Sequence, residues 1–269
     1  MKVIILGTKG MLGQMAHAYF SRSYETIAVD TRYSLERNDE LLSALENAGE
    51  GYVINCIGKI KQKTEDASEL FTINAVLPLH LYNNLQENQF LIQPSTDCVF
   101  SGEKSNWYHV HDKCDATDSY GISKRLGEVA LLQKSNAYIV RVSIIGTDHI
   151  AQIPSGLLGW FLNCPPQAQL QGFTNHYWNG ITTLEWCKSV ERIVLADTAR
   201  QRTGQIIQLG TSESRSKHEL LCLFQEKFKT DFSILPHQTP VQVNRCLEPL
   251  YTSPNLEQQL DELKRFTIT

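Results

Sequence analysis

The chain begins with KVIILGTKGMLG (Lys2–Gly13), in which a short apolar run is followed by three glycines spaced three residues apart. The β-branched run predicts a buried strand, and the residues from Met11 onward predict a helix. Glycines at such a junction permit a tight turn, close approach of the backbone to a pyrophosphate, and close packing of helix on strand. The stretch therefore predicts a dinucleotide-binding unit. The alternative is a plain turn, since the spacing is G-x-x-G-x-x-G rather than G-x-G-x-x-G.

The following residues alternate apolar runs with helical stretches. Four more buried strands are predicted at ETIAVD (Glu25–Asp30), YVINCIG (Tyr52–Gly58), QFLIQPST (Gln89–Thr96) and AYIVRVSIIG (Ala137–Gly146). Helices are predicted at LFTINAVLPLHLYNNLQEN (Leu70–Asn88) and SKRLGEVALLQKS (Ser123–Ser135). Such alternation implies right-handed crossovers between parallel strands. We therefore expect an α/β fold with a doubly wound parallel sheet of the Rossmann type.

The pattern changes near residue 147, where loop-like segments rich in aromatic and amide side chains replace the regular alternation. We expect residues 1–146 to form the dinucleotide-binding domain and residues 147–269 mainly a smaller C-terminal substrate lobe. A segment at about 183–200 is expected to return to the first domain. Within the lobe, SKHELLCLFQEKF (Ser216–Phe228) predicts a helix with a capping box formed by Ser216 and Glu219.

Composition excludes several classes of protein. The 269 residues carry a formal net charge of −4 and no long basic run, which argues against a nucleic-acid partner. The seven cysteines form no C-x-x-C pair, so neither a disulfide framework nor a metal site is expected. No segment approaches the roughly 20 apolar residues of a membrane span, and the first apolar run is too short for a signal peptide. We expect a cytoplasmic protein with no membrane partner; a homodimer is the candidate assembly.

The end of the second predicted strand, VDTR, should contact the ribose of the adenosine. Asp30 can accept hydrogen bonds from the ribose hydroxyls of NADH, with Thr31 beside it. Arg32 can pair with the 2′-phosphate of NADPH. Both residues are present, so NADPH and NADH are both left open, and a solvated loop arginine is the alternative for Arg32.

The catalytic candidates are Tyr120 and Lys124, which share one face of a helix because they are four residues apart. A nearby ammonium lowers the pKa of a phenol, and a general acid works best when its pKa is near the working pH. Thr96 precedes Tyr120 by 24 residues and stands at a strand end, where its hydroxyl can bind a substrate carbonyl oxygen. The alternative for Thr96 is a threonine that caps a turn.

Six motifs together resemble the extended short-chain dehydrogenase/reductase superfamily, and within it the dTDP-4-dehydrorhamnose reductase type. In chain order they are GTKGMLG, VINCIG, INAVLP, STDCVFSG, YGISKRLGE and VRVSIIG. The resemblance implies that Thr96, Tyr120 and Lys124 are the catalytic triad. It implies a cofactor site made of Gly7, Lys9, Gly10, Met11, Leu12, Gly13, Asp30, Thr31, Arg32, Cys56, Ile57 and Gly58, together with Tyr120 and Lys124.

The function implied is NAD(P)H-dependent reduction of a nucleotide-activated 4-keto-6-deoxy sugar, with Tyr120 as proton donor. Expected substrate contacts are Asp97, Cys98, Ser143, Ile144, Asn175, His176, Trp178 and Asn179. A structural, hydrogen-bonded histidine is the alternative for His176. Dehydratases of the superfamily have Asp-Glu where this chain has Asp97-Cys98, so dehydration is not expected. Cys98 and Ile144 also depart from rhamnose reductases, which leaves the sugar open. A sugar-nucleotide epimerase and a non-catalytic regulatory subunit are the alternative functions.

Overall fold

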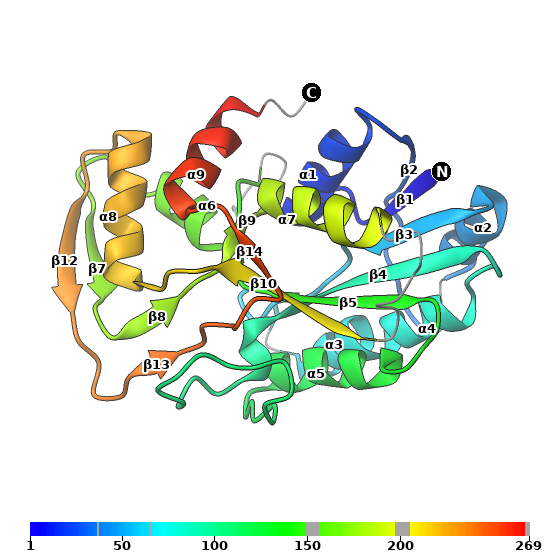
Figure 1. The fold of residues 1–269 in the computed structure, drawn as a ribbon, viewed down its shortest axis with the longest axis horizontal. Coiled ribbons are helices and arrows are strands. Elements are labelled where there is room, and N and C mark those ends of the chain that lie inside the picture. Colours follow the sequence, from blue (N-terminus) through cyan, green and yellow to red (C-terminus); the bar gives the residue numbers. More distant parts are fainter. Residues whose placement is uncertain (37, 65, 149–155, 197–204, 267–269) are drawn as a thin grey trace.

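The structure is a computed structural model that describes residues 1–36, 38–64, 66–148, 156–196 and 205–266. A seven-stranded parallel sheet forms its centre (Figure 1), in the order β2-β1-β3-β4-β5-β10-β14. Its strands are β1 (Lys2–Leu6), β2 (Glu25–Val29), β3 (Gly51–Asn55), β4 (Gln89–Thr96), β5 (Ala137–Val142), β10 (Ile206–Thr211) and β14 (Tyr251–Ser253). The expected doubly wound α/β fold is confirmed. The strand order reverses at β1, so a crevice is expected where β1 and β3 end.

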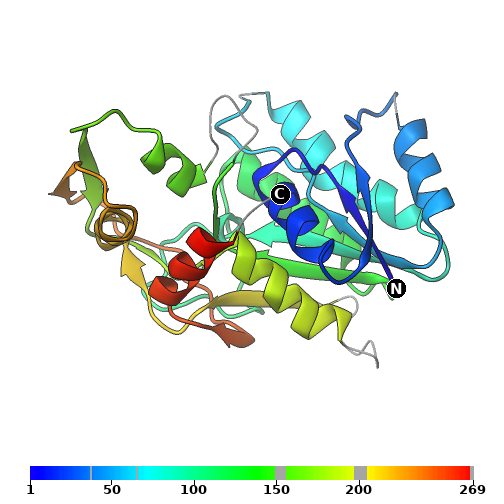
Figure 2. The same cartoon turned by 90° about the horizontal axis from the view of Figure 1, so that it is seen from above.

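Helices cover both faces of the sheet, which explains why its strands are apolar without alternation. One face packs on α1 (Met11–Phe20) and α7 (Thr183–Val190), which continues into the π-helix η3 (Glu191–Leu195). The other face packs on α2 (Asp39–Ala48), α4 (Leu77–Asn83) and α5 (Ser119–Leu131). Along β1, Val3 and Ile5 belong to the first core, whereas Ile4 and Leu6 belong to the second. Figure 2 shows the two helical layers from above.

Two predicted helices differ from those observed. The single helix expected over Leu70–Asn88 is divided into α3 (Ala67–Phe71), the π-helix η1 (Thr72–Val76) and α4, which ends at Asn83. The helix expected from Ser123 begins at Ser119 instead, because the Asp118 carboxylate caps it by accepting a 2.9 Å hydrogen bond from the Gly121 N–H. Tyr120 therefore lies inside the first turn of α5 and not in a turn before it.

The smaller lobe lies beyond the carboxyl ends of the strands (Figure 1). Its strands are β6 (Ile144–Ile145), β7 (Gln169–Phe173), β8 (His176–Trp178), β9 (Ile181–Thr182), β11 (Arg215–Ser216), β12 (Ser233–His237) and β13 (Val243–Asn244). Its helices are α6 (Gly156–Leu162), α8 (Lys217–Phe228) and α9 (Leu256–Arg265). They pair as a three-stranded sheet, β11-β8-β13, and as the pairs β12-β7 and β6-β9. The capping box of Ser216 and Glu219 is confirmed at the start of α8.

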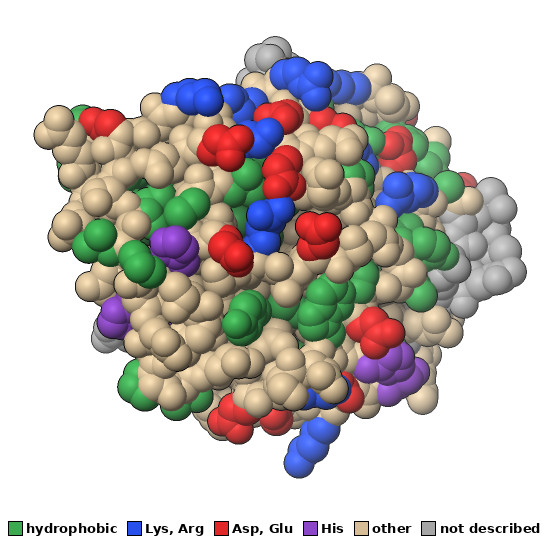
Figure 3. Space-filling model, turned by 60° about the vertical axis from the view of Figure 1, so that its left-hand side comes forward, with side chains coloured by type: hydrophobic (Ala, Val, Ile, Leu, Met, Phe, Trp, Pro, Cys, Tyr) green, Lys and Arg blue, Asp and Glu red, His purple; other side chains and the backbone are tan. Residues whose placement is uncertain are grey.

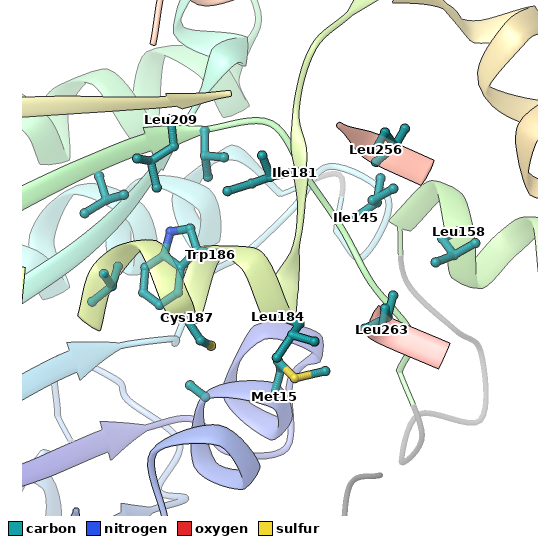
Figure 4. Close-up of a cluster of buried hydrophobic side chains, with 14 of the residues drawn as sticks. Met15, Ile145, Leu158, Ile181, Leu184, Trp186, Cys187, Leu209, Leu256 and Leu263 are labelled. Carbon is teal, nitrogen blue, oxygen red and sulfur yellow. The ribbon is translucent and has the colours of Figure 1, made fainter. Parts of the chain in front are cut away.

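One hydrophobic core runs from the central sheet into the lobe (Figure 4). Met15 of α1 and Cys187 of α7 belong to the same cluster as Leu158 of α6 and Leu263 of α9. The strands β10 and β14 also join the central sheet from beyond residue 200. The division of the chain at residue 146 stays a prediction, and the shared core means that each part supports the other.

Candidate active site

The three glycines after β1 are required for different reasons. Gly7 has a positive φ of +80°, and a Cβ on Gly13 would lie 2.1 Å from the Gly7 carbonyl oxygen. Neither position accepts a side chain without movement of the backbone. A Cβ on Gly10 would meet only that same oxygen, at 3.6 Å, which is ordinary contact. Gly10 also lines the neighbouring cavities, so its missing side chain leaves open space for a ligand at the start of α1.

Two adjoining cavities run along the carboxyl ends of the strands, and we call them together the cleft. The first, of about 510 Å³, is lined by the ends of β1 and β2, and the second, of about 340 Å³, reaches β4 and α5. Both volumes are in the usual range for small-molecule sites. The cavities share Gly10, Cys56, Ile57, Gly58 and Lys59. Predicted residues of the first are Gly7, Lys9, Asp30, Thr31 and Arg32, and those of the second are Met11, Leu12, Thr96, Asp97, Cys98, Tyr120, Lys124, Ser143 and Ile144.

The ribose candidates lie at the outer end of the cleft. Asp30 is exposed and accepts a 2.5 Å hydrogen bond from the Thr8 hydroxyl, which fixes the carboxylate beside the glycine turn. Arg32 lines the same cavity. A carboxylate and a guanidinium therefore line the same end of the cleft.

Asn74 is a cleft residue that was not among the predicted site residues. It is 2% exposed and lies in η1, where a π-helical turn replaces regular helix. Its side chain accepts a 3.0 Å hydrogen bond from the Lys59 N–H, and donates to the Lys59 carbonyl at 2.9 Å and to Ser123 Oγ at 3.1 Å. It thereby ties the loop after β3 to the helix of Tyr120. The one polar residue of the otherwise apolar INAVLP motif was the sequence signal that could have identified Asn74.

Three lysines of the loop after β3 also line the cleft: Lys59, Lys61 and Lys63. Lys59 pairs with Glu69, and Lys61 lies 4.0 Å from the Asp118 carboxylate at the cap of α5. The charged run GKIKQK directly after a predicted strand end was the available signal for this loop.

Thr96 is the last residue of β4, where the 3₁₀ helix η2 (Asp97–Val99) begins. Its hydroxyl accepts a 3.1 Å hydrogen bond from the Cys98 N–H and donates to the Asp97 carboxylate at 3.0 Å. The Thr96 and Tyr120 side chains line the same cavity, and Thr96 acts to lower the pKa of Tyr120. Thr96 thus caps a turn, which was the alternative reading, and faces Tyr120 as well.

Close packing of α5 on the end of β4 sets the position of Tyr120. A Cβ on Gly121 would lie 2.2 Å from the Cys98 carbonyl oxygen, and a Cβ on Gly127 would lie 2.2 Å from the Asn74 carbonyl oxygen. These two glycines let α5 approach η2 and η1 to backbone contact. Tyr120 and Lys124 consequently line the same cavity, as their spacing predicts.

The pKa values of Tyr120 and Lys124 differ from those expected from the sequence. Burial raises the pKa of Tyr120 above its ordinary value. The neighbouring Cys98 and two carboxylates add to the rise, and the nearby Thr96 opposes it. Burial lowers the pKa of Lys124 to about 8, against the favourable charge of Glu128. The Lys124 ammonium donates to the Pro94 carbonyl at 2.7 Å. The expected depression of the tyrosine pKa by Lys124 is therefore not found, because burial dominates at both groups.

Of the predicted substrate contacts in the second half, the structure brings Ser143 and Ile144 to the cleft. Trp178 lies behind them and donates from Nε1 to Ser143 Oγ at 2.7 Å. Asn175 and Asn179 do not line the cleft. The Asn179 side chain binds the Thr211 and Leu247 backbones, and the Asn175 side chain binds Thr239 and Val241.

His176 also lies outside the cleft lining and is hydrogen-bonded through Nε2 to Thr239 Oγ1 at 2.8 Å. This contact matches the structural alternative for His176. Within the described ranges, no group of three His, Cys, Asp or Glu side chains is placed to hold a metal ion. No helix in the described part of the chain is long and apolar enough to cross a membrane.

Comparison with known proteins decides the family. The family model of the RmlD substrate binding domain matches residues 1–153, more than half of the chain. The chain belongs to the RmlD substrate binding domain family. The match covers β4 and α5, the elements that carry Thr96, Tyr120 and Lys124 in this RmlD-family chain. No curated protein sequence matches the chain.

Solved structures of similar fold cover nearly the whole of this RmlD-family chain. A dTDP-4-dehydrorhamnose reductase from Clostridium acetobutylicum is 19% identical, with a TM-score of 0.79 over 99% of this chain and 98% of that one. A dTDP-4-dehydrorhamnose reductase from Bacillus anthracis in complex with NADP is 15% identical, with a TM-score of 0.81 over 98% of both chains. A UDP-glucose 4-epimerase from Thermotoga maritima with UDP-glucose is 14% identical, with a TM-score of 0.77 over 98% of this chain and 99% of that one. At these identities the likeness is one of fold.

Proposed function

We propose that this protein reduces the 4-keto group of a nucleotide-activated 6-deoxy sugar with NADPH or NADH. The observation that carries the proposal is that Thr96, Tyr120 and Lys124 line a cavity which continues, through five shared residues, into the cavity at the glycine turn. Membership of the RmlD substrate binding domain family supports it, as does the likeness in fold to a dTDP-4-dehydrorhamnose reductase in complex with NADP.

The residues of the cleft fit a dinucleotide. Gly10 leaves open space at the start of α1, where free N–H groups and the helix dipole favour a pyrophosphate. Asp30 or Arg32 would hold the adenosine ribose, and Cys56, Ile57 and Gly58 line the path toward Tyr120. When bound, the nicotinamide supplies a hydride to the keto carbon.

The chain's own residues handle the proton. Because its pKa is raised, Tyr120 is fully protonated at neutral pH and can donate from Oη to the oxygen that becomes an alkoxide. The Thr96 hydroxyl, which lines the same cavity as Tyr120, can bind the same substrate oxygen. The phenolate left behind is costly in a buried site, so it needs the Lys124 ammonium, which shares its face of α5.

A panel of nucleotide-linked 4-keto-6-deoxy sugars, offered with NADH and with NADPH, tests the proposal. We expect stoichiometric loss of cofactor absorbance with at least one sugar. Protein that binds NADPH but oxidises none of it with any member of the panel would refute it. An epimerase would instead keep its nicotinamide through dialysis after turnover and would need no added reductant.

A further inference from the structure

Ser143 lines the cleft beside the residues proposed to handle the proton. It directly follows β5, and in the register of the sheet the last residue of β5, Val142, is paired with Thr96 at the end of β4. Ser143 therefore stands one residue beyond the partner of Thr96. The side chains of Ser143, Thr96 and Tyr120 line the same cavity, so the end of β5 contributes a hydroxyl to the part of the cleft that holds Tyr120.

The Trp178 indole determines which hydrogen bonds the Ser143 hydroxyl can make. Trp178 donates from Nε1 to Ser143 Oγ at 2.7 Å. An indole nitrogen is a donor only, so Ser143 Oγ must be the acceptor in this contact. A hydroxyl also has one proton of its own, and among the residues that the structure describes none accepts the proton of Ser143. That proton is left for a ligand in the cavity.

The backbone holds Trp178 and Ser143 in place relative to each other. Trp178 is 4% exposed, and the Ile181 N–H donates to the Ser143 carbonyl at 3.0 Å. A Cβ on Gly180 would lie 2.0 Å from the Ser143 carbonyl oxygen and 2.5 Å from Trp178 Cζ2, so this close approach requires a glycine. The pairing of β9 with β6 continues the contact at Ile144. The smaller lobe thus fixes the direction from which the indole reaches the hydroxyl.

Thr96, by contrast, already uses its proton. Its hydroxyl accepts from the Cys98 N–H at 3.1 Å and donates to the Asp97 carboxylate at 3.0 Å. Thr96 can donate to a substrate only when its hydroxyl turns away from Asp97. A carbonyl oxygen has two lone pairs, and in the proposed reaction Tyr120 occupies one of them. Of the two hydroxyls beside Tyr120, that of Ser143 has its proton available for the other.

The surface of the lobe side favours recognition by single hydrogen bonds. Figure 3, which brings this side forward, shows acidic and basic side chains interspersed over the visible face. A surface on which both signs are mixed gives no broad field of one sign to steer a ligand. Discrimination at an uncharged sugar carbon then depends on donors that act at one atom, of which Ser143 is one.

We propose that the Ser143 hydroxyl donates to the oxygen on C4 of the sugar, as a second donor beside Tyr120, and that Trp178 is the positioning residue that fixes its direction. This rests on the proposed function, which places that carbon at Tyr120. As the carbonyl is reduced its oxygen gains negative charge, so a donor aimed at it stabilises the alkoxide more than the ketone. The same donor selects for an oxygen at C4, because a site built to hydrogen-bond a polar group rejects an analogue that lacks it.

Binding of two sugar nucleotides tests the donor without turnover. Enzyme saturated with its preferred reduced cofactor, which cannot react with a reduced sugar, is titrated with a nucleoside-diphosphate 6-deoxyhexose that has a 4-hydroxyl and with its 4-deoxy counterpart. Both the dTDP and the UDP series are used. Wild type should prefer the hydroxyl form, and Ser143→Ala should reduce that preference about two- to tenfold, as expected for the loss of one hydrogen bond.

Three binding results would overturn the proposal. The first is an unchanged preference in Ser143→Ala. The second is a loss of cofactor affinity alone, which would mean that the hydroxyl serves the nicotinamide carboxamide instead. The third is failure of wild type to bind either sugar nucleotide at millimolar concentration. No reduction takes place in this titration, so failure of the reduction assay is a separate result.

Turnover separates positioning by Trp178 from simple packing. On a keto sugar that wild type reduces, Ser143→Ala should lower kcat about 100-fold with little change in KM. Trp178→Phe keeps an aromatic ring and removes the N–H, and should lower kcat at least about fivefold, because the hydroxyl is then free to turn. Trp160→Phe, which changes an exposed tryptophan of α6 in the same lobe, should match wild type.

The double variant decides whether Trp178 acts through Ser143. Ser143→Ala/Trp178→Phe should be no slower than Ser143→Ala, because the indole N–H has no hydroxyl left to orient. Losses of kcat that multiply in the double variant, or Trp178→Phe as fast as wild type, would overturn the positioning role. Thermal unfolding of each variant, with cofactor titration, shows that the compared proteins are folded.

Discussion

The Lys124 ammonium is held by the carbonyl of Pro94, at 2.7 Å, so the lysine of α5 is anchored on the strand that ends at Thr96. This contact links α5, which carries Tyr120 and Lys124, to β4, which ends at Thr96. It also places the ammonium in a buried setting, which lowers the pKa of Lys124 to about 8.

That pKa predicts the pH dependence of the reaction. In the proposed reaction the Lys124 ammonium stabilises the Tyr120 phenolate. Above about pH 8 a growing fraction of Lys124 is neutral, so kcat should fall as pH rises through this value. Lys124→Arg keeps its charge throughout and should lose this alkaline decline, even with a lower rate. A pH profile of kcat measures both, and an unchanged decline in Lys124→Arg would rule out Lys124 as its source.

The glycine turn predicts a contrast between two alanine substitutions. Gly13→Ala would place a Cβ 2.1 Å from the Gly7 carbonyl oxygen and should destabilise the protein. Gly10→Ala meets that oxygen only at 3.6 Å, so its unfolding midpoint should stay near wild type while NADPH affinity falls at least about tenfold. Thermal unfolding and cofactor titration separate the two effects. Unchanged NADPH affinity in Gly10→Ala would mean that no phosphate approaches there.

A buried ion pair behind the site predicts an acid-sensitive fold. Arg141, 0% exposed, donates to both carboxylate oxygens of Glu128, at 3.0 and 2.8 Å, and Ser95 donates to the same carboxylate at 2.6 Å. Burial alone would raise the pKa of Glu128, but these partners, with Arg125, bring it below its ordinary value.

Glu128→Ala leaves the Arg141 charge buried and should lower the free energy of unfolding by about 3–5 kcal/mol. Arg125→Ala removes a partly exposed partner from the same helix and should lower it by at most about 1 kcal/mol. Because the folded-state pKa of Glu128 is lowered, its contribution is present above the unfolded pKa and is lost as pH falls through the folded value. Urea titrations from neutral pH to pH 3 should show that loss of stability in wild type. If Glu128→Ala and Arg125→Ala lowered the free energy of unfolding equally at neutral pH, the buried pair would not have the importance assigned to it.

The residues that follow β2 predict which side chain distinguishes the adenosine ribose of NADH from that of NADPH. Asp30→Ala should weaken NADH more than NADPH, because the carboxylate binds ribose hydroxyls and repels a 2′-phosphate. Arg32→Ala should lower the affinity for NADPH about tenfold more than the affinity for NADH, because it removes the charge partner of that phosphate. Titration of both cofactors into both variants measures this crossover. If Arg32→Ala weakened both cofactors equally, Arg32 would not be the residue that distinguishes them.

The local parts of this structure were predictable from sequence. The β-branched runs and glycine spacing give the first five strands and the turn at Gly7, because both depend on residues close together in the chain. The start of α5 was missed by four residues, since the cap at Asp118 was not recognised. The strands β10 and β14 could not be assigned to the central sheet, because their pairing depends on contacts with distant segments.

In the candidate site, too, local features were predictable from the sequence and features that depend on distant segments were not. The placement of Thr96, Tyr120 and Lys124 on one cavity follows from strand-end and helix-face rules. The pKa values do not, because they depend on burial that no local pattern reveals. Asn175 and Asn179 look like sugar ligands by residue type, yet their amides are used by backbone groups more than 30 residues away.

Transfer of deuterium from a cofactor labelled at the nicotinamide C4 tests the proposed reduction by identifying both the donor and the acceptor. Wild type incubated with labelled NADPH or NADH and the keto-sugar panel should give a product that carries one deuterium at the sugar C4, with cofactor released as the oxidised form. Tyr120→Phe should slow this by roughly 100- to 10,000-fold while binding the cofactor normally. Turnover of a sugar without deuterium in the product, or with Tyr120→Phe as fast as wild type, would contradict the account.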